Sequence, residues 1–100
     1  MSIFISLGTN IKNRLKNLNT ATRLIASKNI VIVSSSKIYE TSPMENLDQP
    51  FFLNKILMLD TIIMPDDLLI LFKSIEKEMG RKHESERYLP RIIDIDLLTY

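Results

Sequence analysis

Two kinds of hydrophobic spacing alternate along this chain, and their order restricts the fold more than any other feature of the sequence. Apolar residues recur at steps of three and four in residues 11–25 and again in residues 68–79, as they do on one side of an α-helix. Runs rich in β-branched and other apolar residues lie before, between and after these two segments, and such runs favour β-strands. The expected order is therefore β-α-β-β-α-β.

Turn-forming residues separate the expected strands. We expect Gly8, Thr9 and Asn10 to stop the first strand, and Asn10 to cap the helix that follows, because its side-chain oxygen can accept from a free amide of the first turn. The segment 40–50 contains proline, asparagine and aspartate and is expected to be a loop. The strands are predicted at residues 3–7, 30–39, 51–63 and 92–100.

Both expected helices have an apolar stripe, and the second also has clear end signals. Pro65 suits a first helical position, Asp66 and Asp67 favour the positive end of the helix dipole, and Gly80 can adopt positive φ at the helix end. The first stripe comprises Ile11, Leu15, Leu18, Ala21, Leu24 and Ile25, and the second comprises Leu68, Leu69, Leu71, Phe72, Ile75 and Met79.

Two β-α-β halves in this order predict the α+β class and a ferredoxin-like fold, with a four-stranded antiparallel sheet and both helices on one face. A chain of 100 residues, 45% hydrophobic and 25% charged, is expected to form a single globular domain over residues 1–100. Because this fold supports many functions, the function has to be inferred from particular side chains.

Charge and residue content argue against several classes of partner. A net charge of +1 predicts no general attraction to nucleic acid or to membranes. No apolar run approaches the roughly 20 residues of a membrane span, and the absence of cysteine excludes disulfides and thiolate metal sites. The first residues lack the features of a secretory signal. We expect a cytoplasmic protein that acts as a monomer.

The segment Ile93-Asp94-Ile95-Asp96 is the strongest local signal for chemistry. Side chains alternate on a strand, so Asp94 and Asp96 share one face, about 7 Å apart at their Cα atoms, while Ile93 and Ile95 point into the core. Two carboxylates at this spacing can bracket two Mg²⁺ ions. A solvated acidic strand face is the other interpretation, and on this spacing alone it is the better supported one.

A cluster of cations precedes these carboxylates. Arg81, Lys82, His83, Arg87 and Arg91 fall within a short stretch. A triphosphate with its metal ions needs carboxylates for the metal and guanidinium groups for the phosphate oxygens. A solvated basic loop is the simpler alternative. The sequence contains no glycine-rich phosphate loop of a standard kind, so a bound nucleotide would have to be held by metal and arginines.

The centre of the chain offers candidates for binding a flat heterocycle. Phe51 and Phe52 stand beside Asn54, and an aromatic ring with an amide can stack on and hydrogen-bond such a ring system. Taken in isolation, however, aromatic residues on a strand more often belong to the core.

In this order, the segments resemble the 6-hydroxymethyl-7,8-dihydropterin pyrophosphokinase family, and the resemblance spans essentially the whole chain. The matching motifs are the Gly-Thr-Asn turn at 8–10, Tyr-x-Thr-x-Pro at 39–43, Asp-Gln-Pro-x-aromatic-Leu-Asn at 48–54, Glu76 with Gly-Arg at 80–81, and Pro-Arg-x-x-Asp-x-Asp at 90–96. The resemblance implies Mg²⁺-dependent transfer of pyrophosphate from ATP to the hydroxymethyl group of the pterin, with release of AMP, in folate biosynthesis.

The resemblance also implies roles for individual residues. Asp94 and Asp96 would ligate two Mg²⁺ ions and, with Arg81 and Arg91, form the catalytic set. The residues implied for ATP are Glu76, Arg81, His83, Arg91 and Ile92. The residues implied for the pterin are Thr41, Ser42, Pro43, Met44, Phe52, Asn54 and Asp94.

Family members continue further at the C-terminus, so we expect this chain to lack the family's C-terminal third. Two further interpretations stay open: a catalytically impaired remnant or ferredoxin-like module that keeps only partial ATP or pterin binding, and an RNA-binding ferredoxin-like domain. The last ranks lowest, since its aromatic signature motif is absent and the net charge is near zero.

Overall fold

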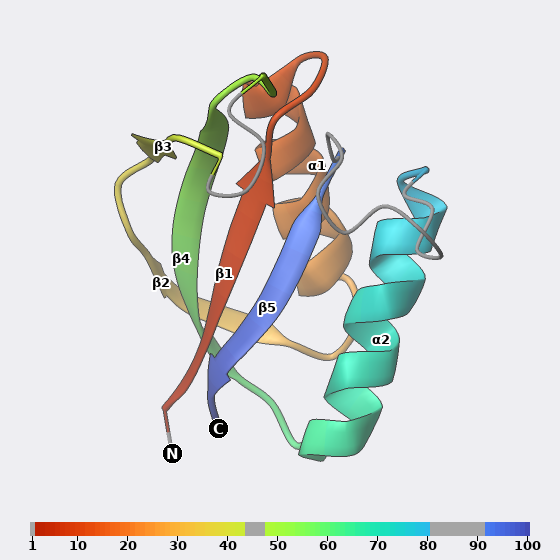
Figure 1. The fold of residues 1–100 in the computed structure, drawn as a ribbon. Helices are drawn as coiled ribbons and strands as arrows, with labels where there is room; N and C mark the ends of the chain where they lie inside the picture. Colours follow the sequence, from red (N-terminus) through yellow and green to blue (C-terminus); the bar gives the residue numbers. More distant parts are fainter. Residues whose placement is uncertain (1, 44–47, 81–91) are drawn as a thin grey trace.

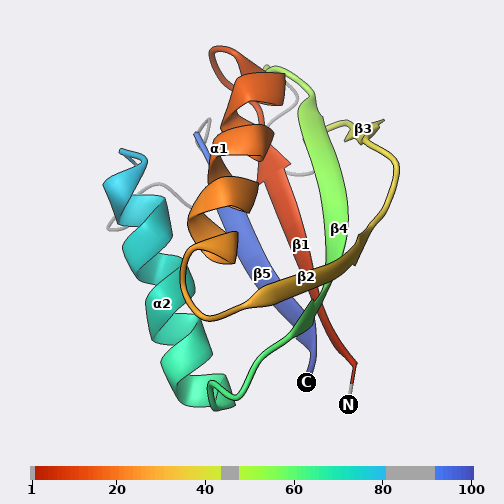
Figure 2. The ribbon, with the colours of Figure 1, turned by 180° about the vertical axis from the view of Figure 1, so that it is seen from behind.

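The computed structural model describes residues 2–43, 48–80 and 92–100, in which two helices pack against one face of an antiparallel sheet (Figure 1). Seen from behind, both helices lie in front of the sheet (Figure 2). The elements are β1 (Ile3–Thr9), α1 (Arg14–Ala26), β2 (Val31–Ser35), β3 (Tyr39–Thr41), β4 (Phe52–Asp60), α2 (Pro65–Glu78) and β5 (Asp94–Thr99).

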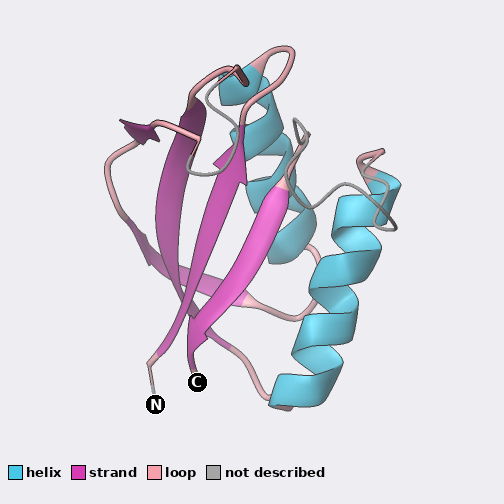
Figure 3. Ribbon diagram, viewed as in Figure 1, coloured by secondary structure: helices cyan, strands magenta, loops and turns pink. Residues whose placement is uncertain are grey.

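The strand order β2-β4-β1-β5, with every pair antiparallel, is the arrangement expected of the ferredoxin-like fold. The predicted α+β class is therefore confirmed. The described residues form five strands and not the expected four, because β3 also pairs with β4. Figure 3 shows β1 and β4 at the centre of the sheet and the connecting loops at its ends.

The fifth strand, β3, lies where the predicted strand 30–39 meets the predicted loop 40–50. The predicted strand is broken after Ser35, and the loop prediction was wrong for Glu40 and Thr41, which belong to β3. The register of β2 against β4 shifts between Ile32 and Ser34, so the strand bends there. Ser36 then accepts, through its Oγ, the hydrogen bond from the backbone amide of Ile56 (2.8 Å), while its own amide donates to the Ile56 carbonyl (2.8 Å). A hydroxyl replaces a backbone carbonyl in this pair, and the ladder is interrupted.

The start of α1 differs from the prediction. Asn13 is the N-cap residue, and its side chain accepts from the Lys16 amide (3.1 Å), so the assignment of the cap to Asn10 was wrong. The predicted stop at Gly8 was also wrong, because β1 is a central strand and pairs on both sides at that residue. Lys12, with a φ of 58°, turns the chain between β1 and α1.

The end signals of α2 are confirmed. Pro65 lies in the first turn with Asp66 and Asp67, and Gly80 has a φ of 101°, a conformation that favours glycine. The helical stripes are narrower than predicted, since Leu15 and Leu69 are 50% and 41% exposed. Only the side of each helix that meets the sheet is covered.

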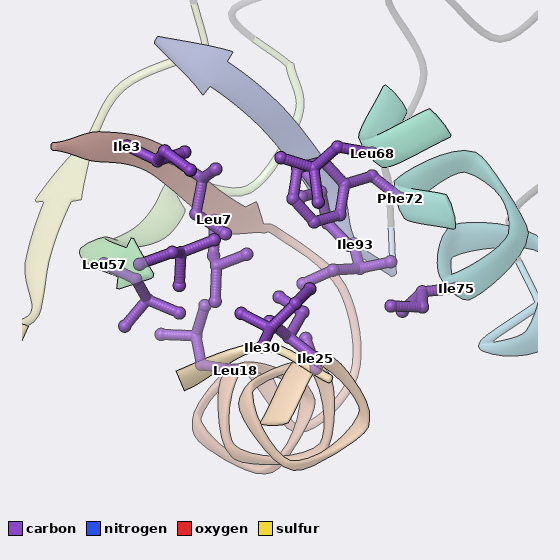
Figure 4. Close-up of a cluster of buried hydrophobic side chains, with 14 residues drawn as sticks. Ile3, Leu7, Leu18, Ile25, Ile30, Leu57, Leu68, Phe72, Ile75 and Ile93 are labelled. Carbon is purple, nitrogen blue, oxygen red and sulfur yellow. The ribbon is translucent and has the colours of Figure 1, made fainter. Parts of the chain in front are cut away.

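The hydrophobic core lies between the sheet and the two helices. Alternate residues of the central strands point into it, so Leu57 and Leu59 of β4 are buried. Figure 4 shows side chains from both helices and from the sheet gathered in one cluster, with Phe72 beside Leu68. The buried apolar residues are Ile3, Ile5, Leu7, Leu18, Ala21, Ile25, Ile30, Leu57, Leu59, Leu68, Phe72, Ile75, Ile93 and Ile95.

Candidate active site

The face of the sheet that points away from α1 and α2, here called the outer face, carries the candidate site. Gly8 of β1 pairs with Asn54 of β4 on one side and with Asp94 of β5 on the other. Residues directly opposite one another on neighbouring strands project to the same face. Asn54, Gly8 and Asp94 therefore form one row across three strands, which we call the Gly8 row.

The two carboxylates of β5 lie on the outer face, as the alternation predicted. Asp94 is half-buried and Asp96 exposed, whereas Ile93 and Ile95 are buried on the opposite side. Asp96 pairs with Ser6, so it lies one row further along the sheet than Asp94. Both aspartates make further polar or electrostatic interactions within the protein.

The Asn54 amide has a defined orientation. Its Nδ2 donates to the Thr41 Oγ1 of β3 (2.9 Å) and lies 3.3 Å from the carbonyl oxygen of Tyr39. With the nitrogen held by β3, the Oδ1 atom is on the side of Gly8: a Cβ atom added to Gly8 would lie 3.2 Å from it. Asn54 thus presents an acceptor toward the middle of the Gly8 row.

Phe52 completes this part of the outer face. Its Cδ1 would lie 3.5 Å from a Cβ atom on Gly8, so the phenyl ring and the Asn54 amide border the same bare stretch of main chain. Phe52 is half-buried and pairs with Thr41, whereas Phe51 precedes the strand and is 51% exposed. Neither phenylalanine belongs to the buried core, contrary to the usual expectation for aromatic residues on strands.

Glu76 reaches β5 from the helix side. Its carboxylate, on the last full turn of α2, is 4% exposed and accepts a hydrogen bond from the backbone amide of Ile95 (2.7 Å). Ile95 lies between the two aspartates in the sequence. This contact therefore fixes β5 relative to α2 at the point where the strand carries its acidic side chains.

A second set of buried polar side chains secures the loops next to the site. Asn10 is 1% exposed, and its Nδ2 donates to the Gln49 Oε1 (2.9 Å) and to the Pro50 carbonyl (3.2 Å). Asn17 of α1 donates to the Thr9 Oγ1 (3.1 Å) and to the Ile11 carbonyl (3.0 Å). The turn after β1 is thereby joined to the segment that leads into β4.

The structure brings part of the expected site together. Thr41, Phe52 and Asn54 lie on the adjoining strands β3 and β4, and Asp94 and Asp96 lie on β5, on the other side of β1. Ser42 is exposed and Pro43 is buried just after β3. Ile92 is half-buried, and its Cδ1 would lie 3.2 Å from a Cβ on Gly80. Four expected site residues lie outside the described part of the chain: Met44, Arg81, His83 and Arg91.

Three residues of the site region belong to the matching motifs but were given no role in the site: Gly8, Asn10 and Gln49. Arg14 was not singled out. Gly8 was interpreted as a turn residue, although a glycine between two strand-forming residues also marks a place where another group approaches the backbone closely. No signal in the sequence pairs Asn10 with Gln49, because a buried amide contact between residues 39 positions apart is visible only in the folded chain.

The fold and the outer face define an α+β protein whose sheet combines two carboxylates, an oriented amide and an aromatic ring on one surface. Residues 4–100 match the family described as 7,8-dihydro-6-hydroxymethylpterin-pyrophosphokinase (HPPK), and the chain belongs to this family. The family predicted from the ordered motifs is thereby confirmed.

Curated relatives agree with this assignment. The chain is 43% identical over 98 residues to a folate synthesis bifunctional protein of Arabidopsis thaliana, with 98% of this chain and 20% of that protein covered. It is 40% identical over 98 residues to the 2-amino-4-hydroxy-6-hydroxymethyldihydropteridine pyrophosphokinases of Methylorubrum extorquens and Bacillus subtilis, covering 97% of this chain and 61% and 58% of those proteins. The chain thus spans at most about three fifths of the length of these relatives.

No helix among the described residues is long and apolar enough to span a membrane.

Proposed function

We propose that this chain carries the substrate-binding core of an enzyme that transfers pyrophosphate from ATP to 6-hydroxymethyl-7,8-dihydropterin, giving AMP and the pterin diphosphate, in folate biosynthesis. The observation that carries the proposal is the Gly8 row, which sets the Asn54 amide and the Asp94 carboxylate on either side of a residue without a side chain. The names of the bacterial relatives, which match along 97% of this chain, support the same activity.

The β3–β4 side of the row is proposed to bind the pterin. Phe52 offers an aromatic ring, and the Asn54 Oδ1 offers an acceptor for the ring N–H and amino groups of a pterin. Thr41 contributes through its hydrogen bond to Asn54, while Ser42, Pro43 and Met44 follow it along the chain and are proposed as further pterin-binding residues. Asp94 would border the pterin from the opposite strand.

The carboxylates of β5 fit Mg²⁺ by their chemistry and their placement. Mg²⁺ prefers hard oxygen ligands and binds through one or two carboxylates together with substrate phosphates and water. Among the described residues, no three His, Cys, Asp or Glu side chains are grouped so as to hold a metal ion. With the phosphates of ATP as further ligands, Asp94 and Asp96 would hold two Mg²⁺ ions, which would supply charge neutralisation on the phosphate oxygens.

The transfer itself would join the hydroxymethyl oxygen to the β-phosphorus of ATP. The bond from that phosphorus to the oxygen bridging the α-phosphate breaks, AMP leaves with that oxygen, and the hydroxyl proton is released to solvent. Arg81 and Arg91 are proposed to neutralise charge on the phosphates, with Glu76, His83 and Ile92 at the ATP site. Such transfer depends chiefly on positioning and charge stabilisation, which this set of residues can provide.

Two single-residue variants should affect the binding of the two proposed substrates separately. We expect Asp96→Asn to reduce the affinity for Mg²⁺-ATP at least about tenfold, because a metal ligand is lost, with pterin affinity kept. We expect Asn54→Ala to reduce pterin affinity about tenfold or more, with Mg²⁺-ATP affinity kept. Calorimetric titration of each ligand measures both, and Asp60→Asn, an exposed carboxylate at the end of β4, serves as the control.

AMP formation from Mg²⁺-ATP, with and without the pterin, then tests the reaction. Pterin-dependent AMP supports the enzyme. Binding of both ligands without AMP would favour the alternative of a binding module, which the partial coverage of the relatives keeps open. Absence of binding by either ligand to the folded chain would overturn the proposed function.

A further inference from the structure

Arg14 connects three segments of the chain at the edge of the proposed pterin site. As the first residue of α1, it places its Nη1 2.6 Å from the Glu40 Oε2 of β3 and 3.0 Å from the carbonyl oxygen of Phe51, just before β4. The Arg14–Glu40 contact is the only ion pair found among the described residues. One guanidinium nitrogen therefore links α1 to β3, which carries Thr41, and to the residue just before β4, the strand that carries Phe52 and Asn54.

β3 depends on such a connection because it has little other support. It contains three residues, all exposed, and within the described part of the chain it pairs only with β4. Short edge strands with few buried contacts open readily by local unfolding. The helix α1, in contrast, buries three of its residues in the core and provides a rigid point of attachment.

The residues that Arg14 contacts alternate with residues of the outer face. Glu40 pairs with Leu53, whose side chain packs against the core on the helix side, whereas Thr41 pairs with Phe52 on the outer face. The contact between Arg14 and Glu40 therefore restricts the position of the neighbouring residue Thr41 relative to β4. The Thr41 Oγ1 accepts the hydrogen bond that orients the Asn54 amide (2.9 Å).

We propose that Arg14 is a positioning residue for pterin binding, which acts through its ion pair with Glu40 and its hydrogen bond to Phe51. This inference rests on the proposed function, since it concerns the same site. The two side chains of the pair are 33% and 49% exposed, and ion pairs of this exposure contribute little to global stability. The effect of Arg14 should therefore appear in pterin binding and only weakly in the melting temperature.

The test compares Arg14→Gln with Arg23→Gln in the full chain. Arg23 is an exposed arginine on the same helix, and its guanidinium donates to the Thr20 Oγ1 (3.3 Å) within α1. Arg14→Gln is expected to weaken pterin binding about fivefold to tenfold, with Mg²⁺-ATP affinity unchanged, while Arg23→Gln matches the wild type. Arg14→Lys, which keeps the charge, should recover part of the loss.

Two further readouts separate positioning from a general structural role. The difference in pterin affinity between the wild type and Arg14→Gln should shrink in 1 M salt, because a partly exposed ion pair is screened. Amide hydrogen exchange of residues 39–41 should be faster in Arg14→Gln than in Arg23→Gln.

The outcomes that would overturn the inference are distinct from those that would overturn the proposed function. Equal pterin affinity in Arg14→Gln and Arg23→Gln, with a wild type that binds, removes the inference alone. Equal losses of pterin and Mg²⁺-ATP affinity together with a lowered melting temperature also remove it, since Arg14 would then be merely structural. A wild type that binds no pterin overturns the proposed function and the inference with it.

Discussion

At the scale of single residues, Gly8 shows how an absent side chain can shape a site. A Cβ atom there would meet the Asn54 Oδ1 at 3.2 Å, closer than an ordinary contact, and Phe52 at 3.5 Å. The nearer atom ends a side chain and can shift, but a shift would disturb the hydrogen bond between Asn54 and Thr41. The lack of a side chain at Gly8 therefore matters for the orientation of the Asn54 side-chain amide more than for the backbone conformation of β1.

We expect Gly8→Ala to weaken pterin binding about tenfold while leaving the free energy of unfolding unchanged or slightly raised. The added methyl group displaces Asn54, whereas alanine restricts the unfolded chain and fits an extended backbone. Pterin titration and urea denaturation measure the two quantities. Ser6→Ala, two residues earlier on the same face, is the control, and a Gly8→Ala protein with normal pterin affinity would contradict this account.

Predictions for single residues succeeded where the two-residue alternation of a strand determines which face a side chain lies on. The alternation of β5 correctly placed Asp94 and Asp96 on one face and Ile93 and Ile95 in the core. The prediction that Asn10 caps the first helix failed, because asparagine suits a helix cap and a buried loop contact equally well. Only the turn made by Lys12 moves the cap to Asn13.

At the scale of elements, the contact between α2 and β5 holds the carboxylate strand in place. The Glu76 side chain accepts from the Ile95 amide (2.7 Å) in a buried setting. A buried amide that loses its acceptor retains the full penalty of its desolvation. The order of the elements was predictable from periodicity, but this contact was not, because a glutamate in a helix usually faces water.

We expect Glu76→Ala to lower the free energy of unfolding by about 2 kcal/mol, since it leaves the Ile95 amide without this acceptor. Glu76→Gln, which keeps an acceptor oxygen, should lose less than half as much. Urea denaturation compares both with Glu78→Ala, an exposed glutamate on the same helix. A Glu76→Ala protein as stable as the wild type would refute a role of this contact in fixing β5.

The division of β2 from β3 also lies beyond sequence reasoning at the element scale. Residues 30–39 contain enough β-branched residues for one strand, and the serines at 34–36 gave no sign of a break. The break depends on Ser36 pairing with Ile56 through its hydroxyl, a choice that requires the partner strand to be in place. As a result, the short strand that carries Thr41 was not anticipated as a separate element.

At the scale of the whole molecule, the Asn10–Gln49 hydrogen bond joins the N-terminal part of the chain to its middle. Both side chains are buried, at 1% and 8% exposure, and the bond spans 39 residues of sequence. It connects the turn after β1 to the entry of β4, while the core beneath connects the sheet to the helices. The topology followed from the sequence, but the polar contacts that secure it did not.

We expect Asn10→Ala to lower the free energy of unfolding by about 1–3 kcal/mol, because Gln49 and the Pro50 carbonyl each lose a buried donor. In a double-mutant cycle with Gln49→Ala, the two losses should not add, because the residues share one hydrogen bond. Thermal and urea unfolding provide the measurements. Strictly additive losses would show that the pair is not coupled.

The position of β1 between β4 and β5 has a consequence for a chain that is still being synthesised. The ribosome makes Gly8 first, Asn54 later and Asp94 later still, with a delay on the order of seconds before the last strand emerges. Asn54 can therefore pair with Gly8 on the nascent polypeptide before β5 is available to pair with β1. Asp94 joins the Gly8 row last, so a ribosome-bound intermediate is expected to form the proposed pterin side of the row before the proposed metal and nucleotide side.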